Sequence, residues 1–221
     1  KRILRENPFL PLVEVLAIVN QDTSDVRVFL NRADGTASFD PFLTPPTQTG
    51  DTPSPNESCD MNGDGLMDIV TGDKFGDTVS VLLGRGDGTF DPSAQYSMGD
   101  LPRGLAAFDM DGDGDSDVIS ANANSSNMSI RLNNGDGTLG ARTSFNGGGS
   151  AEWGLASGDM NNDGVMDLVV AWQGASRHQL QILHGDGLWA LAAVEPMYLA
   201  RAPLDLDIGD NEGNGWPQVT V

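Results

Sequence analysis

The chain has 221 residues, and its 32 acidic side chains against 12 basic ones give a net charge of −20. This excess argues against nucleic acid as a partner, because binding to a phosphate backbone depends on Lys and Arg. Aspartate supplies 26 of the acidic residues, which favours loops and turns over helices. No apolar run approaches the ~20 residues of a membrane-spanning helix, and the single cysteine, Cys59, leaves no internal disulfide.

The predicted elements begin with a short strand and a tight turn. Apolar residues alternate with polar ones over residues 26–30, and an Asp-Gly pair follows at Asp34. Such alternation is typical of a half-buried strand, and Asp-Gly suits a hairpin because tight hairpin turns need positive φ. The same combination recurs with strands at 79–83, 130–132 and 180–183 and turns at Asp87, Asp136 and Asp186. A repeated antiparallel unit is therefore predicted.

Three nine-residue acidic loops lie ahead of the later units, at residues 60–68, 109–117 and 159–167. Each has oxygen-bearing side chains at positions 1, 3, 5 and 9 and a glycine at position 6. Calcium takes about six to eight oxygens, so alternate carboxylates on a tight loop can surround it. Position 7 is expected to contribute its main-chain carbonyl. The predicted ligands are Asp60, Asn62, Asp64, Leu66 and Asp68; Asp109, Asp111, Asp113, Asp115 and Asp117; and Asp159, Asn161, Asp163, Val165 and Asp167.

The residues after each loop distinguish it from an EF-hand. An EF-hand has a glutamate at position 12 and continues into a helix. Position 12 here is Thr71, Ser120 or Val170, each in a run that favours a strand. Further strands are expected before the loops, most clearly at 103–108 and 152–157. One repeat is thus four short antiparallel strands, with the metal loop joining the first to the second.

The spacing of the loops indicates a repeat fold. Asp60 and Asp109 are 49 residues apart, and Asp109 and Asp159 are 50 apart. A further 51 residues lead to Asp210, which opens a degenerate copy over residues 210–218. Four-stranded units that recur every ~40–50 residues are the blades of a β-propeller. The predicted fold class is therefore all-β, a propeller of four-stranded antiparallel blades.

On these loops, the strands after them and the Asp-Gly-Thr turns, the chain resembles the FG-GAP/VCBS repeat family. These are the calcium-bearing propeller repeats of integrin α-subunits and many secreted bacterial proteins. The resemblance covers about residues 13–221. It implies a calcium-stabilised propeller that serves recognition or adhesion outside the cell, and the three intact loops imply about three calcium ions.

A single propeller domain, or a fragment of one, is expected over residues 1–221. Its blades are predicted at about 13–45, 54–98, 102–147 and 151–197, with a partial blade at 203–221. The loop of the first repeat should lie at about 7–15, where the sequence cannot bind calcium. Three arrangements remain open: a slice of a longer protein, which we favour, a small ring closed by the two ends, or association of chains through open blade edges.

No catalytic constellation is visible, so we expect a non-catalytic module at the cell surface or outside the cell, secreted or periplasmic. Its ligand, a protein or a glycan, would bind at the blade loops. One alternative is a lectin-like propeller in which Trp189 stacks on a sugar ring. Another is a structural repeat module of a surface assembly or a secreted enzyme. His178 and His184, on either side of one strand, are expected to be ordinary polar surface.

Overall fold

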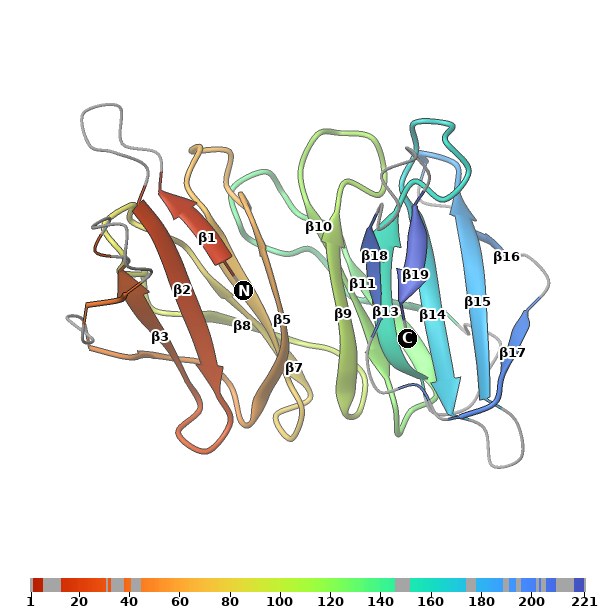
Figure 1. Ribbon diagram of the computed structural model, residues 1–221, viewed down its shortest axis with the longest axis horizontal. Helices are drawn as coiled ribbons and strands as arrows, with labels where there is room; N and C mark the ends of the chain where they lie inside the picture. Colours follow the sequence, from red (N-terminus) through yellow and green to blue (C-terminus); the bar gives the residue numbers. More distant parts are fainter. Residues whose placement is uncertain are drawn as a thin grey trace.

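The computed structural model describes residues 2–5, 13–30, 32, 38–40, 45–145, 152–173, 178–188, 191–193, 196–201, 203, 206–209 and 217–220. Within these ranges every regular element is a β-strand (Figure 1). The same residues contain no helix long and apolar enough to cross a membrane.

The strands pair with their neighbours in the chain, all antiparallel. The first sheet contains β1 (Arg2–Arg5), β2 (Val13–Asn20), β3 (Asp25–Leu30) and β4 (Thr47–Gln48). The second contains β5 (Pro53–Cys59), β6 (Asp68–Asp73), β7 (Thr78–Leu82) and β8 (Ala94–Ser97). The third contains β9 (Pro102–Phe108), β10 (Asp117–Asn122), β11 (Asn127–Arg131) and β12 (Thr143–Phe145).

The fourth sheet has five strands, because β16 and β17 pair with successive parts of β15. Its members are β13 (Glu152–Gly158), β14 (Asp167–Gln173), β15 (His178–Gly185), β16 (Leu191–Ala193) and β17 (Met197–Leu199). A two-stranded sheet of β18 (Asp207–Gly209) and β19 (Gln218–Thr220) follows. It lies within the partial blade predicted at 203–221.

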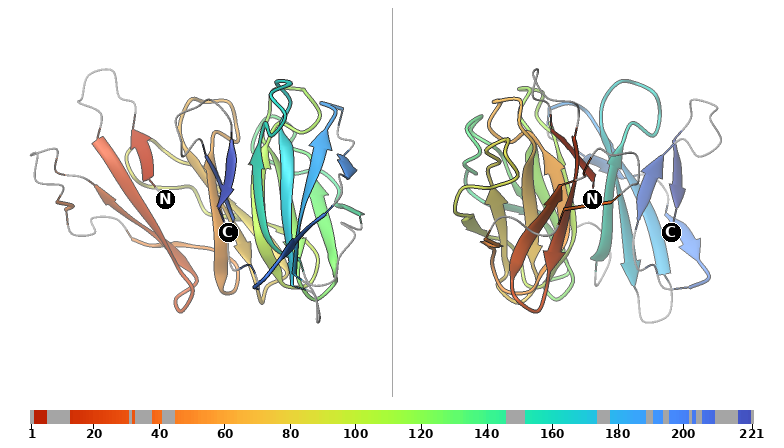
Figure 2. Two further views of the ribbon diagram at one scale, coloured as in Figure 1. Left: turned by 45° about the vertical axis from the view of Figure 1, so that its right-hand side comes forward. Right: turned by 60° about the vertical axis from the view of Figure 1, so that its left-hand side comes forward.

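The sheets stand side by side in chain order, as blades do (Figures 1 and 2). From the second sheet onward the first strands lie nearest one another, with β5 against β9, β9 against β13, and β13 against β18, whereas the first sheet meets β5 through β2. The all-β propeller architecture of about four blades is therefore confirmed. One boundary differs: pairing of β1 with β2 extends the first sheet back to Arg2, ahead of the expected start at residue 13.

The hydrophobic core is divided into layers between neighbouring sheets. Along β6, Ile69 packs with the first sheet around Val26, whereas Val70 packs with the third sheet around Leu105 and Val118. Successive side chains of a strand point to opposite faces, so the second strand of each inner sheet is buried on both sides. Because burying such a side chain contributes about 1.5–3 kcal/mol, much of the fold's stability resides between the sheets.

One of these layers contains a tryptophan. Trp172 on β14 is 2% exposed and packs in the cluster between the third and fourth sheets. It is therefore a core residue.

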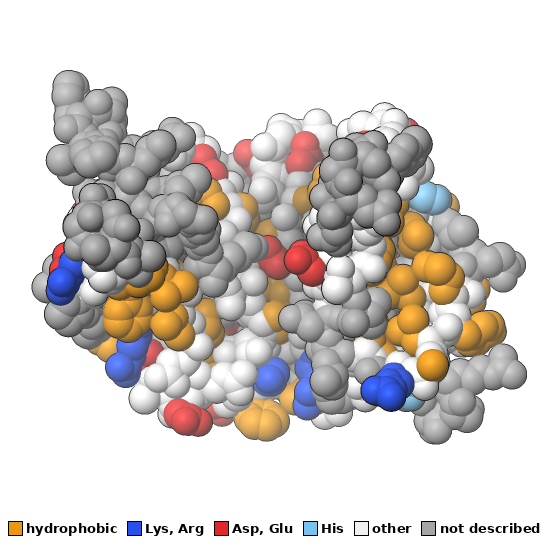
Figure 3. All heavy atoms as spheres, viewed as in Figure 1, with side chains coloured by type: hydrophobic (Ala, Val, Ile, Leu, Met, Phe, Trp, Pro, Cys, Tyr) orange, Lys and Arg blue, Asp and Glu red, His pale blue; other side chains and the backbone are white. Residues whose placement is uncertain are grey.

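The three acidic loops lie at the same edge of the molecule, uppermost in Figure 1. They share this edge because each joins the first strand of its sheet to the second, and the sheets have the same topology. The hairpin turns from β6 to β7 and from β10 to β11 lie at the opposite edge. Figure 3 shows Asp and Glu side chains along the upper edge of one face.

Candidate metal centre

Two left-handed residues give each loop its shape. Position 6 is Gly65, Gly114 or Gly164, with φ of 80°, 96° and 86°. Position 4 is also left-handed, with φ of 71° at Gly63, 81° at Gly112 and 60° at Asn162. Glycine adopts this region freely and asparagine is the side-chain-bearing residue that tolerates it well. The asparagine in the third loop therefore preserves the same backbone path.

The aspartate at position 1 organises the amides of its own loop. Asp60 Oδ1 accepts a hydrogen bond from Gly63 N at 2.8 Å, and its Oδ2 accepts one from Gly65 N at 2.8 Å. Asp109 accepts the equivalent pair at 2.7 and 3.0 Å, and Asp159 Oδ2 accepts the position-6 amide at 2.9 Å. Hydrogen bonds to its own first carboxylate therefore close each loop.

The aspartate at position 5 accepts the main-chain amide of position 7. The distances are 2.8 Å from Leu66 N, 3.0 Å from Asp115 N and 2.8 Å from Val165 N. In the third loop this bond is the main cause that lowers the pKa of Asp163. These bonds fix position 7 through its backbone, while coordination by its carbonyl remains a prediction.

The aspartate at position 9 is fully buried in all three loops. Asp68 accepts amides from Met61 at 2.8 Å and Gly84 at 2.7 Å, one on each oxygen. Asp117 accepts Met110 N at 3.0 Å and Asn133 N at 2.9 Å. Asp167 accepts the equivalent pair, from positions 160 and 185, at 2.9 and 3.0 Å. Position 9 thus ties its loop to the end of the third strand.

These amide donors were not identified from the sequence. The residues at position 2 were a usable signal, since all three loops have a methionine there, Met61, Met110 and Met160. Met61 and Met110 are 1% and 4% exposed and belong to the cores between sheets. Burial of the methionine holds its amide in place beneath the position-9 carboxylate.

The environment of these carboxylates favours a proton or a cation. Burial raises the pKa of Asp68 and of Asp117 to about 6, despite the amide bonds that lower each value. The nearby carboxylates of Asp60 and Asp64, or of Asp111 and Asp113, raise the pKa further. A divalent ion offsets both effects, because it supplies positive charge to the cluster.

The second loop comes nearest to a complete metal site. Carboxylate oxygens of Asp109, Asp111 and Asp117 lie within 4.8 Å of one another. Asp111 Oδ1 is buried and has no hydrogen-bond partner, which is costly unless a cation or water satisfies it. The donor set consists entirely of oxygens, the ligands that calcium prefers. The residues of this loop therefore fit calcium.

The first and third loops have asparagine at position 3. Asn62 Nδ2 donates to Asp64 Oδ2 at 3.0 Å, and Asn161 Nδ2 donates to Asp163 Oδ2 at 2.8 Å. Rotation of the amide by half a turn would direct its oxygen toward the same carboxylate, which is favourable only with a cation between them. The rotation would also break the hydrogen bond that each amide oxygen accepts, from Asp64 N at 3.1 Å or Asp163 N at 2.9 Å. Calcium binding by these two loops therefore stays a prediction.

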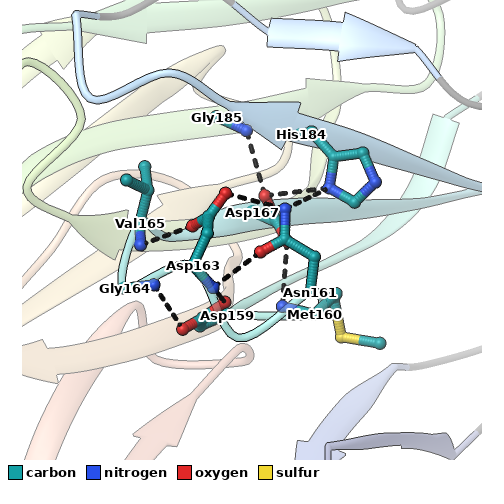
Figure 4. A network of polar contacts seen from close by, with 9 residues as sticks. All are labelled: Asp159, Met160, Asn161, Asp163, Gly164, Val165, Asp167, His184 and Gly185. Atoms are coloured by element: carbon teal, nitrogen blue, oxygen red, sulfur yellow. Dashed lines mark hydrogen bonds and ion pairs between the residues drawn. The ribbon is translucent and has the colours of Figure 1, made fainter.

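His184 lies beside the third loop (Figure 4). Its Nδ1 is 3.2 Å from Asp167 Oδ1 and 3.4 Å from Asn161 Nδ2. The interpretation of His184 as ordinary polar surface was therefore incomplete, because its ring lies against two predicted metal ligands. His184 immediately precedes Gly185, whose amide donates to the position-9 aspartate of the third loop. In the other two loops the residue that precedes the equivalent donor is a leucine, Leu83 or Leu132. Among the three loops, only the third therefore has a neighbouring imidazole.

Several predictions concern residues outside the described ranges. Trp189 is one of them, as are most of the degenerate loop at 210–218 and most of the segment at 7–15. The stacking role of Trp189 therefore stays a prediction.

Solved structures offer likenesses of fold. One is a lectin from Agrocybe aegerita, whose structure was solved to explain its recognition of non-reducing terminal N-acetylglucosamine. Its sequence is 19% identical and the TM-score is 0.47; the match covers 85% of this chain and 51% of the lectin chain. A chain in the crystal structure of BBS1N in complex with ARL6DN, soaked with lead, is 14% identical with a TM-score of 0.50. That match covers 74% of this chain and 48% of the other. The chain thus spans about half the length of these solved chains.

Sequence comparison identifies the repeat. No curated protein sequence matches the chain. The family model for the FG-GAP-like repeat matches three times in tandem, at residues 12–71, 60–120 and 109–170. Each match ends shortly after one of the acidic loops, within the strand that follows it. The repeats therefore have the same period as the sheets. The chain belongs to the FG-GAP-like repeat family.

Proposed function

We propose that the chain is a calcium-stabilised, non-catalytic propeller module that works outside the cell in adhesion or recognition. The observation that carries the calcium assignment is the second loop, where Asp109, Asp111 and Asp117 converge and Asp111 Oδ1 has no hydrogen-bond partner. The repeat family and the equivalent hydrogen bonds in the other two loops support extending the assignment to three ions.

The role of calcium would be structural. Each ion would hold together positions 1, 3, 5 and 9 of a loop whose last residue is also bonded to the end of the third strand. Removal of the ion would leave several carboxylates close together at one edge of the molecule, where their repulsion opposes folding. Calcium would thereby make rigid the edge on which a protein or glycan partner could bind.

Isothermal titration calorimetry with calcium tests the site. The wild-type chain should bind about three ions, and Asp111→Asn should weaken the second site by an order of magnitude or more. The matched control is Asp115→Val, which removes a carboxylate from position 7 of the same loop and places there the residue of the third loop, Val165. This control should retain all three ions. No calcium binding by the wild type, or equal losses in both variants, would contradict the proposal.

The setting and the partner class need their own experiment. Calcium modules outside cells bind with Kd of about 10⁻⁴–10⁻³ M, whereas cytosolic sensors bind at about 10⁻⁷–10⁻⁵ M. A Kd in the weaker range would support an extracellular role. Binding to arrays of glycans and of cell-surface proteins, in calcium and in chelator, should reveal a calcium-dependent partner that Asp111→Asn loses and Asp115→Val keeps. Calcium-independent binding would contradict the proposed role of the ions.

A further inference from the structure

Asn133 connects the first two acidic loops, which belong to different sheets. Its side chain is 5% exposed. Its Nδ2 donates to the carbonyl of Met61 at 2.7 Å and to the carbonyl of Ser116 at 3.1 Å. Met61 is position 2 of the first loop, and Ser116 is position 8 of the second. One amide group therefore bridges both loops across the boundary between the second and third sheets.

The bridge continues to predicted ligands on both sides. In the first loop, the amide of Met61 donates to Asp68 at 2.8 Å. In the second, the backbone amide of Asn133 donates to Asp117 at 2.9 Å. Asp68 and Asp117 are thus linked by three hydrogen bonds between buried groups, through the backbone of Met61 and through Asn133.

The side chain of Asn133 is itself held in one orientation. Its Oδ1 accepts a hydrogen bond from Gly135 N at 3.2 Å, which fixes the nitrogen toward the two carbonyls. The turn that follows also lies close to both loops. A Cβ on Gly137 would lie 3.6 Å from Asn62 Cβ in the first loop, and one on Gly135 would lie 2.6 Å from Asp115 Oδ2 in the second. Movement of either loop would therefore disturb Asn133.

In the second and fourth sheets, which carry the first and third loops, a glycine occupies this place. The position-9 aspartates of the first and third loops accept their strand-end amides from Gly84 and Gly185. Gly84 and Asn133 are equivalent positions, because each forms an isolated β-bridge just after the third strand of its sheet. Glycine supplies the backbone donor without a side chain, so Gly185 cannot join the second loop to the third as Asn133 joins the first to the second.

We propose that Asn133 couples calcium binding at the first and second loops, so that these two sites fill cooperatively while the third fills independently. This inference rests on the proposed calcium function. The first ion would order Met61, Asn133 and Ser116 together, and the second ion would then bind a loop whose ordering has already been completed. Shared ordering of this kind gives positive coupling, and the coupling is reciprocal between the two sites.

The test uses matched substitutions in the neighbouring loops. Asp64→Asn weakens the first site and Asp163→Asn weakens the third, at the same loop position. Calcium affinity at the second site is followed by NMR through the amide of Gly114, which donates to Asp109. Asp64→Asn should raise the Kd at the second loop by about 5-fold or more, whereas Asp163→Asn should change it by less than about 2-fold.

Asn133→Gly supplies the second arm, because it places the residue of the other two sheets at this position. In that background, Asp64→Asn should no longer affect the second loop. Equal effects of Asp64→Asn and Asp163→Asn, or coupling that persists in Asn133→Gly, would overturn the inference while leaving calcium binding established. Absence of calcium binding in the wild type would instead overturn the proposed function and the inference together. If Asn133→Gly does not fold, the comparison of the two loop variants decides alone.

Discussion

The metal-free protein should lose stability as the pH rises from about 4 to about 6. Burial raises the pKa of both Asp68 and Asp117 from 3.8 to about 6 in the folded state. A carboxyl group with a raised folded-state pKa binds its proton more tightly when folded. Its contribution to stability is therefore complete below the unfolded-state pKa and is lost as the pH rises through the folded-state pKa.

The magnitude follows from the size of the rise. One pKa unit corresponds to about 1.36 kcal/mol, so ionisation at pH 7 costs each of the two groups about 3 kcal/mol. The combined loss of about 6 kcal/mol is comparable with the whole stability of many domains. The lowered pKa values of Asp25, Asp136 and Asp163 act in the opposite direction. The side chains of Asp136 and Asp163 are exposed, so solvent weakens their effect.

Equilibrium unfolding in urea, with a chelator present, measures this effect. Between pH 4.5 and pH 7 the free energy of unfolding should fall by about 4 kcal/mol, and Asp117→Asn should remove about half of that difference. Added calcium should make the protein more stable at pH 7 than at pH 4.5, since the ion requires ionised ligands. Equal or greater metal-free stability at pH 7 would show that Asp68 and Asp117 do not have raised pKa values in the folded state.

Three further substitutions test the packing. Asp73 is fully buried and accepts hydroxyl hydrogen bonds from three side chains. Asn122 occupies the equivalent place in the third sheet. In urea unfolding, Asp73→Ala should therefore lose about 2–3 kcal/mol of stability, whereas Asp73→Asn should lose less than about 1 kcal/mol. Ile119 packs between the third and fourth sheets, so Ile119→Ala should lower the free energy of unfolding by about 3–4 kcal/mol. Phe75→Ala, at a position that is 68% exposed, should change it by no more than about 0.5 kcal/mol. Similar losses in the two variants would contradict the layered core. Gly84→Ala should lower the melting temperature, because its Cβ would lie 2.4 Å from a backbone oxygen; an unchanged melting temperature would contradict that close contact.

The repeated architecture was predictable from the sequence because its signals are local. The position-6 glycines and the β-branched runs after each loop specify a turn and a strand without reference to the rest of the chain, and the period of 49–50 residues between loops then predicts the blades. All three loops adopt the expected left-handed glycine. The same local signal failed at the chain start, where β1 pairs with β2 across a segment with no recognisable motif.

The links between blades were not predictable, because they depend on contacts across sheets. Asn133 follows a strand and precedes a turn, and nothing near it in sequence indicates a bond to the carbonyl of Met61, 72 residues away. His184 was interpreted as surface for the same reason, since its proximity to Asp167 arises only when β14 and β15 pair. Burial of the position-9 aspartates likewise results from the packing of whole sheets.

The metal assignment is decided by a crystal structure determined with calcium. One ion is expected in each loop at 60–68, 109–117 and 159–167. Asp111 Oδ1 should be a ligand in the second loop, and the amide oxygens of Asn62 and Asn161 should be ligands in the other two. Loops that contain only water at millimolar calcium, with the hydrogen bonds of Asn62 and Asn161 unchanged, would contradict the metal assignment.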